Sequence, residues 1–416
     1  MSFYARISPH PSDTIEVQVA KERTATNLLR LRAALDESIP AKRIDGKLLL
    51  ATWNVREFGE GRFRAWGGPS APASTPVASP YTSTASTETI LTGPGGSPSR
   101  PWPRGRTPDS AAAEEHGMKG RYWESIYYIA EIINRFDLVA LQEVRDDMED
   151  FQLVVQILGR WWKYLVTDVA AGSQGNRERV AFLYDERKLK FDGLAGEVVL
   201  PPGRKQEPAF QLARTPFIVG FCSGWFRFTI CSTHLYYGES RADDPQRLRE
   251  MDLLAGTLAG EVKKPTAWAK NMILLGDFNI FSTEDQQYKV LTQKHGFTVP
   301  RTMIGKRTNA GQNHPYDQIA FIAPSLGGRL EHSQSGIFPI FDHVFRDEDE
   351  ALYAALMGSG YDMDSKGRVR NAAGKRGYYR DKWRTFQMSD HNPLWVELES
   401  DFSDDYLKRL SARKPA

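Results

Sequence analysis

The sequence has few cysteines and no marked excess of either charge. Its two cysteines, Cys222 and Cys231, are too few for a disulfide scaffold and have no zinc-site spacing. We expect two free thiols, as in a reducing compartment, although they flank an expected hairpin and one bridge between them is geometrically conceivable. The formal net charge of only +2 means that any attraction to nucleic acid must come from a local patch.

The sequence also shows no pattern typical of a conventional secretory signal or of a membrane span. The opening residues, MSFYARISPHPSDTIEVQ, contain no apolar stretch behind a basic flank, which a conventional secretory signal requires. No segment approaches the ~20 consecutive apolar residues of a membrane span. We therefore expect a cytoplasmic protein, with leaderless export as the alternative.

What is present predicts one large globular domain with additions. We expect an N-terminal extension over 1–46, a catalytic domain over 47–399 and a C-terminal tail over 400–416. In the extension, a helix from Thr24 to Ser38 is expected, because apolar residues recur at helical spacing. Those residues are Leu28, Leu29, Leu31 and Leu35.

Two insertions interrupt the expected domain. Residues 59–117 are rich in Pro, Ser, Thr, Ala and Gly, a composition that buries too little apolar surface to offset the entropy of ordering. We expect a flexible insertion there, either a plain solvated loop or a docking or phosphorylated tether. The second insertion, 345–387, is basic and aromatic.

Short apolar strands and amphipathic helices interleave along the domain. The strands are KLLLATWNV, DLVALQEV, RVAFLYD, NMILLGDFN, YDQIAFIA and PLWVEL, with a hairpin from FIVGF to FRFTICSTH. Helices are expected around RYWESIYYIAEIINRF, Met148 to Leu158 and Leu248 to Leu258. Because some strands are linked by hairpins and others by helices, the sheets should be mixed rather than purely parallel.

Polar side chains stand at the ends of six expected strands. The eight residues are Asn54, Glu143, His234, Asp277, Asn279, Asp317, Asp390 and His391. Apolar strands that repeatedly end in a carboxylate, amide or imidazole are a poor way to build a core. They are a good way to gather ligands on one rim of a rigid scaffold, and we expect these side chains to meet there.

Each residue, taken singly, also fits an ordinary structural explanation. Asn54 fits a turn amide, and GDFN fits a tight turn. Glu143 fits an ion pair with Arg145, and His234 fits a hydrogen-bonded interior histidine. The functional interpretation therefore rests on the whole set, not on any one member.

The set suits hydrolysis assisted by a hard metal ion. Glu143, Asp390 and Asn54 offer oxygen donors, which suit Mg²⁺, with Mn²⁺ as the alternative. The absence of paired cysteines and of an HExxH motif disfavours zinc. A divalent cation offsets the charge by which a phosphodiester repels a nucleophile. Two histidines with carboxylate partners supply a base for water and a proton donor.

With these residues in hand, the chain resembles the endonuclease/exonuclease/phosphatase superfamily, most closely its deoxyribonuclease I-like branch. The matching motifs are, in order, WNVREFG, VALQEVRD, NRERVAFLYD, LARTPF, STHL, LLGDFN, YDQIAF and SDHNPLWVEL. They span about residues 47–399, apart from the two insertions. The resemblance implies an α/β (α+β) fold: a four-layer sandwich of two packed mixed β-sheets flanked by helices.

The resemblance also implies a metal centre and a base. In it, Glu143 is the main metal ligand, assisted by Asn54 and Asp390. His391 is the general base, held in tautomer and orientation by Asp317.

Further roles follow from the same resemblance. It pairs His234 with Glu178 of NRERV as the second acid/base, and the family motif alone supplies Glu178. Asp277 and Asn279 position the nucleophile and contact the phosphate. The remaining substrate-binding residues that it implies are Arg145 and Arg214. The nuclease branch often has an aromatic residue two positions before Glu178, where this chain has Asn176.

The second insertion bears on the choice of substrate. Its basic residues include Arg376, Arg380 and Lys382, which we expect to neutralise phosphates. The aromatic residues between them either lie on bases or sugars or pack against the body of the protein. They are Tyr378, Tyr379, Trp383 and Phe386.

Three functions remain open from the sequence. We favour a metal-dependent endonuclease acting on DNA, with nucleic acid as its partner. The alternative is a phosphoesterase of the same superfamily that acts on a phospholipid headgroup, an inositol phosphate or a nucleotide. The third is a non-catalytic nucleic-acid-binding scaffold. A nuclease should present a basic cleft, whereas a lipid enzyme should expose an apolar loop near the site.

Overall fold

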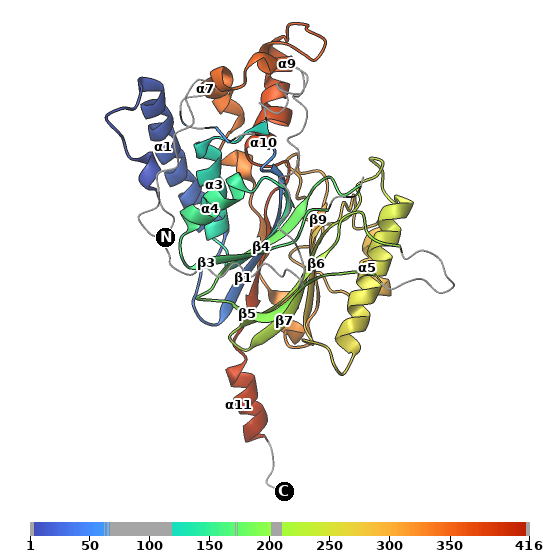
Figure 1. Cartoon of the computed structure of the whole chain (residues 1–416). Helices are drawn as coiled ribbons and strands as arrows, with labels where there is room; N and C mark the ends of the chain where they lie inside the picture. Colours follow the sequence, from blue (N-terminus) through green and yellow to red (C-terminus); the bar gives the residue numbers. More distant parts are fainter. Residues whose placement is uncertain are drawn as a thin grey trace, which may run out of the picture.

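Two packed β-sheets form the centre of the protein, as the computed structural model shows (Figure 1). The structure describes residues 4–61, 63–64, 66, 119–170, 172, 174–200 and 210–412. The first sheet has six strands in the order β10-β11-β1-β2-β4-β3, and the second has five in the order β5-β6-β7-β8-β9. Both sheets mix parallel and antiparallel neighbours, as predicted.

The strands of the first sheet are β1 (Lys47–Phe58), β2 (Leu138–Val144), β3 (Trp162–Val166), β4 (Arg179–Asp185), β10 (Ser335–Ile337) and β11 (Leu394–Glu399). Those of the second are β5 (Lys190–Glu197), β6 (Phe217–Ser223), β7 (Phe226–His234), β8 (Met272–Asp277) and β9 (Asp317–Ile322). Every strand expected from the sequence is present. Strands β3, β5 and β10 were not anticipated.

The side chains of strand β1 pack alternately into two different cores. Successive side chains of a strand point to opposite faces, so Leu48 and Leu50 enter the core between the sheets. Leu49, Ala51 and Trp53 enter a second core between the first sheet and its helices. A continuous apolar run is therefore required here, because both faces of the strand are buried.

Helices cover the outer face of each sheet, which completes the predicted four-layer sandwich. Helices α1 (Ile15–Ser38), α3 (Trp123–Asn134) and α4 (Glu149–Leu158) lie over the first sheet, and α5 (Pro245–Lys263) lies over the second (Figure 1). The expected start of the first helix at Thr24 is wrong, because α1 begins at Ile15 behind a Thr14 cap. Its buried positions include Leu28, Leu31 and Leu35, whereas Leu29 is exposed.

The second insertion folds into a cluster of short helices that we call the cap. Its helices are α7 (Glu350–Tyr353), α8 (Ser359–Asp362), α9 (Ala372–Tyr378) and α10 (Arg384–Gln387), with a π-helical turn at Tyr379–Trp383. The four aromatic residues named above are buried, and three of them belong to the core that contains α1 and α3. The packing alternative is therefore correct, and stacking of these rings on nucleic-acid bases is ruled out.

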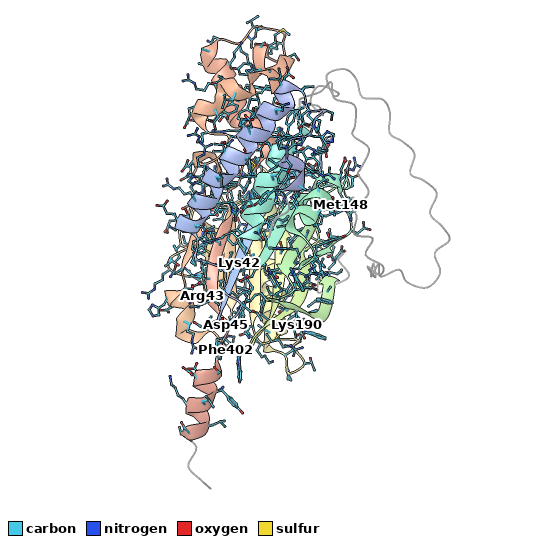
Figure 2. The ribbon with its side chains drawn as sticks, turned by 90° about the vertical axis from the view of Figure 1, so that its left-hand side faces the viewer. Lys42, Arg43, Asp45, Met148, Lys190 and Phe402 are labelled. Carbon is cyan, nitrogen blue, oxygen red and sulfur yellow. The ribbon has the colours of Figure 1, made fainter. Side chains whose placement is uncertain are left out.

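The remaining segments lie at the periphery. Short helix α6 (Gln286–Lys289) follows β8, and α11 (Ser403–Ser411) projects from the end of the sheets opposite to the cap (Figure 1). Figure 2 views the molecule from the side of α1 and labels Lys42, Arg43 and Asp45 in the connection to β1. Residues 67–118, which hold most of the expected flexible insertion, lie outside the described residues.

Two further observations concern the expectations from composition. Cys222 and Cys231 are both free thiols. Among the described helices, none combines the length and apolar character needed to cross a membrane.

Candidate active site

Strand register brings the predicted polar residues to one rim. In the second sheet, His234 on β7 lies beside Asp277 on β8, which in turn lies beside Asp317 on β9. In the first sheet, Asn54 on β1 lies beside the end of β2, and Glu143 follows within an irregularity of the β1–β2 register. Glu143 has φ 60°, so its backbone departs from the regular strand conformation. Its side chain therefore does not follow the alternation of the strand residues before it.

Asp277 is the meeting point of the two sheets. Its Oδ2 accepts a hydrogen bond from Asn54 Nδ2 at 3.0 Å and lies 3.6 Å from His234 Nε2 and 3.7 Å from His391 Nε2. Burial opposes ionisation of Asp277, but the two histidines outweigh it and hold the pKa of this carboxyl below its ordinary value. An anion is therefore fixed at the centre of the rim.

The backbone on both sides of Asp277 has an unusual conformation, with a strict steric requirement at Gly276 in β8. Gly276 has φ 130°, and a Cβ at this position would lie 2.0 Å from the carbonyl oxygen of Thr233. Only glycine fits, which lets β8 approach β7 closely enough to place Asp277 beside His234. Asn279 has φ 52°, and its backbone N–H donates to Asp277 Oδ1 at 2.9 Å.

One histidine–carboxylate pair joins the segment just before β11 to the first residue of β9. The Nδ1 atom of His391 and Oδ2 of Asp317 are 2.7 Å apart, and both side chains are buried. Burial disfavours the charged imidazole, but Asp317 and Asp277 outweigh it and raise the pKa of His391 well above its ordinary value. The pKa of Asp317 is raised, because burial is only partly offset by His391.

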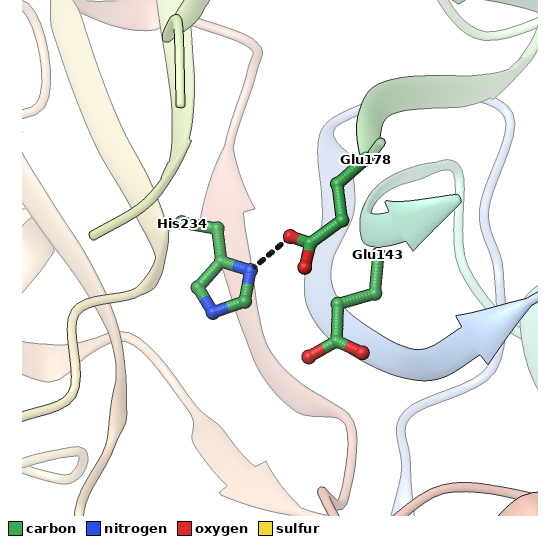
Figure 3. Close-up of side chains that lie close together, drawn as sticks. All are labelled: Glu143, Glu178 and His234. Atoms are coloured by element: carbon green, nitrogen blue, oxygen red, sulfur yellow. Dashed lines mark hydrogen bonds and ion pairs between the residues drawn. The ribbon is translucent and has the colours of Figure 1, made fainter. Parts of the chain in front are cut away.

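The second pair joins the two sheets on the other side of Asp277. His234 Nδ1 lies 2.7 Å from Oε2 of Glu178, which immediately precedes β4 (Figure 3). Arg214 Nε lies 2.7 Å from the same oxygen. Burial opposes ionisation of Glu178, but His234 and Arg214 outweigh it and lower its pKa to about 2. Against burial and Arg214, Glu178 raises the pKa of His234.

Glu143 and Asn54 form an oxygen-rich group beside these pairs. Glu143 Oε1 accepts from Asn54 Nδ2 at 2.8 Å, and Oε2 accepts from the backbone N–H of Glu57 at 2.9 Å. Burial and the nearby Glu178 raise the pKa of Glu143. Asn54 Oδ1 is buried and accepts no hydrogen bond from the described residues. A buried acceptor without a donor, next to a carboxylate, fits a site for a hard cation.

The carboxylates and histidines fall into two groups that could hold a metal ion. One contains Glu143, Glu178 and His234, and the other contains Asp277, Asp317 and His391. Asp390 belongs to neither group. Its half-exposed side chain lies 3.5 Å from Arg56 Nη1, although its charge contributes to raising the pKa of Glu143. Of the three predicted metal ligands, Asp390 is thus the least tightly held.

The predicted substrate-binding residues lie in different places. Arg214 is buried and bonded to Glu178, and Arg145 Nη1 donates to the carbonyl oxygen of Asn176 at the rim. Arg376 lies 3.8 Å from Glu350, Arg380 pairs with Asp381, and Lys382 is exposed. Among the described residues, no ion pair or hydrogen bond joins these three cap residues to the rim.

A cavity of about 180 Å³ opens beside the second pair. It reaches from Glu143, Glu178 and His234 towards the edges of both sheets. Its lining includes the acidic side chains Asp168 and Glu197 and the basic side chains Arg179 and Arg214. With Glu143 and Glu178 counted, four carboxylate side chains line this wall against two guanidinium groups.

Sequence reasoning missed two arginines, one at the rim and one buried behind it. Arg56 stacks on the Phe386 ring at 3.9 Å and pairs with Asp390, so it links β1 to the cap. Arg121 is fully buried behind the site and bonds to backbone carbonyls on both sides of it. Arg56 stands in the motif WNVREFG, two residues after Asn54, which could have marked it. No local pattern marks Arg121.

Comparisons with known proteins show similarity at the level of the fold. No protein-family model matches the sequence, and a search of curated proteins finds no match. One solved structure with a similar fold is an endonuclease/exonuclease/phosphatase family protein from Bacteroides thetaiotaomicron. It shares 15% identity and a TM-score of 0.46, with 86% of this chain and 98% of that chain covered.

Two further structures show the same degree of similarity. A mannosyl-6-phosphatase from the same bacterium shares 15% identity and a TM-score of 0.45, covering 84% of this chain and 99% of its own. The human Nocturnin catalytic domain shares 15% identity and a TM-score of 0.41, covering 68% and 89%. At these identities and TM-scores, the similarity assigns no activity to this chain.

Proposed function

We propose that the chain is a divalent-metal-dependent phosphodiester hydrolase, and that it cuts DNA internally. The observation that carries the proposal is the convergence at Asp277. Two histidine–carboxylate pairs, each bridging the two sheets, direct their Nε2 atoms at this carboxylate from two sides. Buried Glu143 and Asn54 lie next to it. This combination supplies two proton-transfer groups and a set of oxygen donors within one rim.

The oxygen donors fit Mg²⁺, or Mn²⁺ in its place. Glu143 and Asn54 Oδ1 would hold the cation, with Asp390 at the more exposed side. When bound, it would offset the negative charge of the phosphate during attack. The unpartnered amide oxygen of Asn54 is the local support for this assignment.

The two histidines divide the proton transfers. Asp317 engages Nδ1 of His391, which leaves Nε2 to accept a proton from the attacking water. Glu178 engages Nδ1 of His234 and raises its pKa against burial, so His234 acts in its charged form, whose Nε2 proton stabilises the phosphate or is transferred to the leaving oxygen. Asp277 lies between the two Nε2 atoms and orients the water.

Nicking of supercoiled plasmid tests the proposal. We expect cleavage with Mg²⁺ or Mn²⁺ that EDTA abolishes and that His391→Ala reduces by roughly 10²–10⁴-fold. His295→Ala is a matched control, because His295 forms a 2.7 Å pair with Asp252 away from the rim. It should leave nicking unchanged. An absence of DNA cleavage with both ions would reject DNA as the substrate.

A second candidate, hydrolysis of a small phosphoester, is favoured by the cavity beside His234. The carboxylates in its wall disfavour a second phosphate, and its volume of about 180 Å³ suits a small polar group. Inositol phosphates, a nucleotide and a glycerophosphoester should be assayed under the same conditions. Turnover of one of these without plasmid nicking would select this candidate. Binding of DNA without any hydrolysis would instead select a non-catalytic scaffold.

A further inference from the structure

Arg121 lies behind the rim at the start of α3. Its side chain is completely buried, and it follows the segment that lies outside the described residues. Its guanidinium donates to three backbone carbonyl oxygens: Arg56 at 2.7 Å, Glu57 at 3.3 Å and Met388 at 3.4 Å. These acceptors belong to the two segments that flank the proposed site, at the end of β1 and before β11.

One peptide group connects Arg121 directly to Glu143. The carbonyl oxygen of Arg56 accepts from Arg121, and the N–H of the same peptide group, on Glu57, donates to Glu143 Oε2 at 2.9 Å. Glu57 has φ 45°, a left-handed conformation that a residue with a side chain rarely adopts. The orientation of this peptide is therefore held from both ends, and a hydrogen bond at its oxygen polarises its N–H.

A second connection runs to His391. Arg121 reaches the carbonyl oxygen of Met388, and the next residue, Ser389, donates to Asn54 O at 2.5 Å. Ser389 Oγ also accepts from the backbone N–H of His391 at 2.9 Å. The segment that carries His391 is thus tied to β1 within two residues of the Arg121 contact.

The residues on either side of Arg121 form hydrogen bonds to the segment that precedes His391. Gln387 donates to Gly120 O at 3.0 Å and accepts from the backbone N–H of Tyr122 at 3.2 Å. Asp150, also buried, lies 3.7 Å from Arg121 and lowers the cost of burying this guanidinium, although burial raises the pKa of Asp150 itself to about 7. A buried arginine that is paired in this way can hold several acceptors without leaving an isolated charge.

We propose that Arg121 is a positioning residue that sets the geometry of Glu143, Asn54 and His391 through the backbone of residues 56–57 and 388–389. This inference rests on the proposed function. It differs from a purely structural role in one consequence: weakening the Arg121 contacts should change metal affinity and turnover, not stability alone. Substitutions that disturb such supporting contacts typically lower metal affinity by 10–100-fold.

Arg135, at the other end of α3, provides a matched control. It also donates to a backbone carbonyl, that of Ile39, and pairs with an aspartate, Asp36, at 2.6 Å. The 12 residues of α3 separate the two arginines by about 18 Å, so Arg135 is remote from the rim. Both arginines stabilise the ends of one helix, but only Arg121 contacts the flanks of the site.

The experiment compares Arg121→Lys, Arg121→Met and Arg135→Met in the full chain. Free Mn²⁺ is followed by electron paramagnetic resonance to give its Kd, and kcat and KM are measured on the substrate that the wild type cleaves. Urea unfolding reports stability. For Arg121→Lys, which keeps the charge beside Asp150, we expect an approximately tenfold weaker Mn²⁺ Kd and an approximately tenfold lower kcat, with KM within threefold. Arg135→Met should lose stability while its Mn²⁺ Kd stays within twofold.

The outcomes separate the inference from the function on which it rests. A folded Arg121→Lys variant with wild-type Mn²⁺ Kd and kcat would overturn the positioning role while leaving the proposed function intact. If both Arg121 variants fail to fold, Arg121 is a structural arginine, and the inference is also overturned. A wild type that neither binds Mn²⁺ nor cleaves any phosphoester would overturn both proposals together.

Discussion

The two histidine–carboxylate pairs have almost the same geometry but different electrostatic surroundings. In each, Nδ1 lies 2.7 Å from a carboxylate oxygen, and Nε2 lies 3.6 or 3.7 Å from Asp277. Glu178, however, also contacts Arg214 at 2.7 Å and lies 3.9 Å from Arg145. Among the described residues, no arginine or lysine forms an ion pair with Asp317.

Under the proposed function, we expect this difference to give the two histidines different tasks. The cationic partner of Asp317 among the described residues is His391 alone, and against burial Asp317 and Asp277 raise the pKa of His391 well above its ordinary value. His234 shares Glu178 with an arginine, which opposes the rise of its own pKa. Environments that distinguish two otherwise similar titratable groups are typical of a division between acid and base. His391 is therefore the stronger proton acceptor, and His234 suits the donor role.

The largest expected effect comes from removing each imidazole in turn. We expect His391→Ala to lower kcat by about 10³–10⁴-fold, and His234→Ala by about 10²–10³-fold, because the base acts on the attacking water itself. Steady-state kinetics on the cleaved phosphoester gives both values, with His295→Ala as the unaffected reference. A larger loss for His234→Ala would reverse the assignment of the two roles.

Replacing the carboxylates should separate activity from stability. Asp317→Asn should lower kcat by about 10²-fold with little loss of stability, because His391 can release its proton when this anion is removed, whereas a buried arginine cannot. Glu178→Gln should lower the free energy of unfolding by about 3–5 kcal/mol, because Arg214 would remain buried without its anion. Kinetics and urea unfolding of the two variants test this contrast, and equal losses of stability would remove it.

The pH dependence of activity should shift in a defined direction when Asp317 is replaced by Asn. His391 must be neutral to accept a proton, so its raised pKa places the rise of wild-type activity at higher pH than for an ordinary histidine. Without the charge of Asp317, the pKa of His391 falls and the rise of activity should move to lower pH. An unmoved profile would exclude His391 as the group that titrates.

Acid stability should depend on the pair that contains arginine. The pKa of Glu178 is lowered from 4.5 to about 2 by His234 and Arg214, against burial. A lowered carboxyl pKa contributes stability that is present above the unfolded value and is lost as pH falls through the folded one. For the metal-free protein we expect a loss of about 3 kcal/mol between pH 4.5 and pH 2. Urea unfolding across this range should show this loss in the wild type and not in Glu178→Gln.

The sequence predicted the sandwich and the convergence of polar strand ends because both follow from local patterns. β1, β2 and β8 are continuous apolar runs, and a polar residue at the end of such a run has to lie at a rim. Strand β5 was missed because KFDGLAGE has little buried surface and its register is broken between Phe191 and Ala195. The segment has neither a continuous apolar run nor a regular alternation of apolar and polar residues, the two patterns that predict a strand.

The residues that surround the site could not be predicted from the sequence, because their positions depend on contacts between distant segments. Nothing in GMKGRYW distinguishes Arg121, whose role depends on carbonyls 64 and 267 positions away in the chain. The aromatic residues of the cap could equally face solvent or the interior, and only the packing of Tyr379 and Trp383 against the α1–α3 core decides between these. Composition gives the residue types of a segment, whereas tertiary contacts determine which of them remain free to bind.

The smallest expected effect concerns the cap, which contacts neither histidine pair through its basic residues. Arg376, Arg380 and Lys382 lie on α9 and the following turn, and two of them already pair with acidic neighbours. If the cap meets the backbone of bound DNA, replacing all three with Ala should weaken binding a few-fold at low salt and lower the salt slope by at most about one per charge. Catalysis at saturating substrate should stay unchanged, because both histidine pairs remain intact. Binding measured at several salt concentrations decides the matter: identical affinity and slope in the triple variant would show that DNA contacts only the rim.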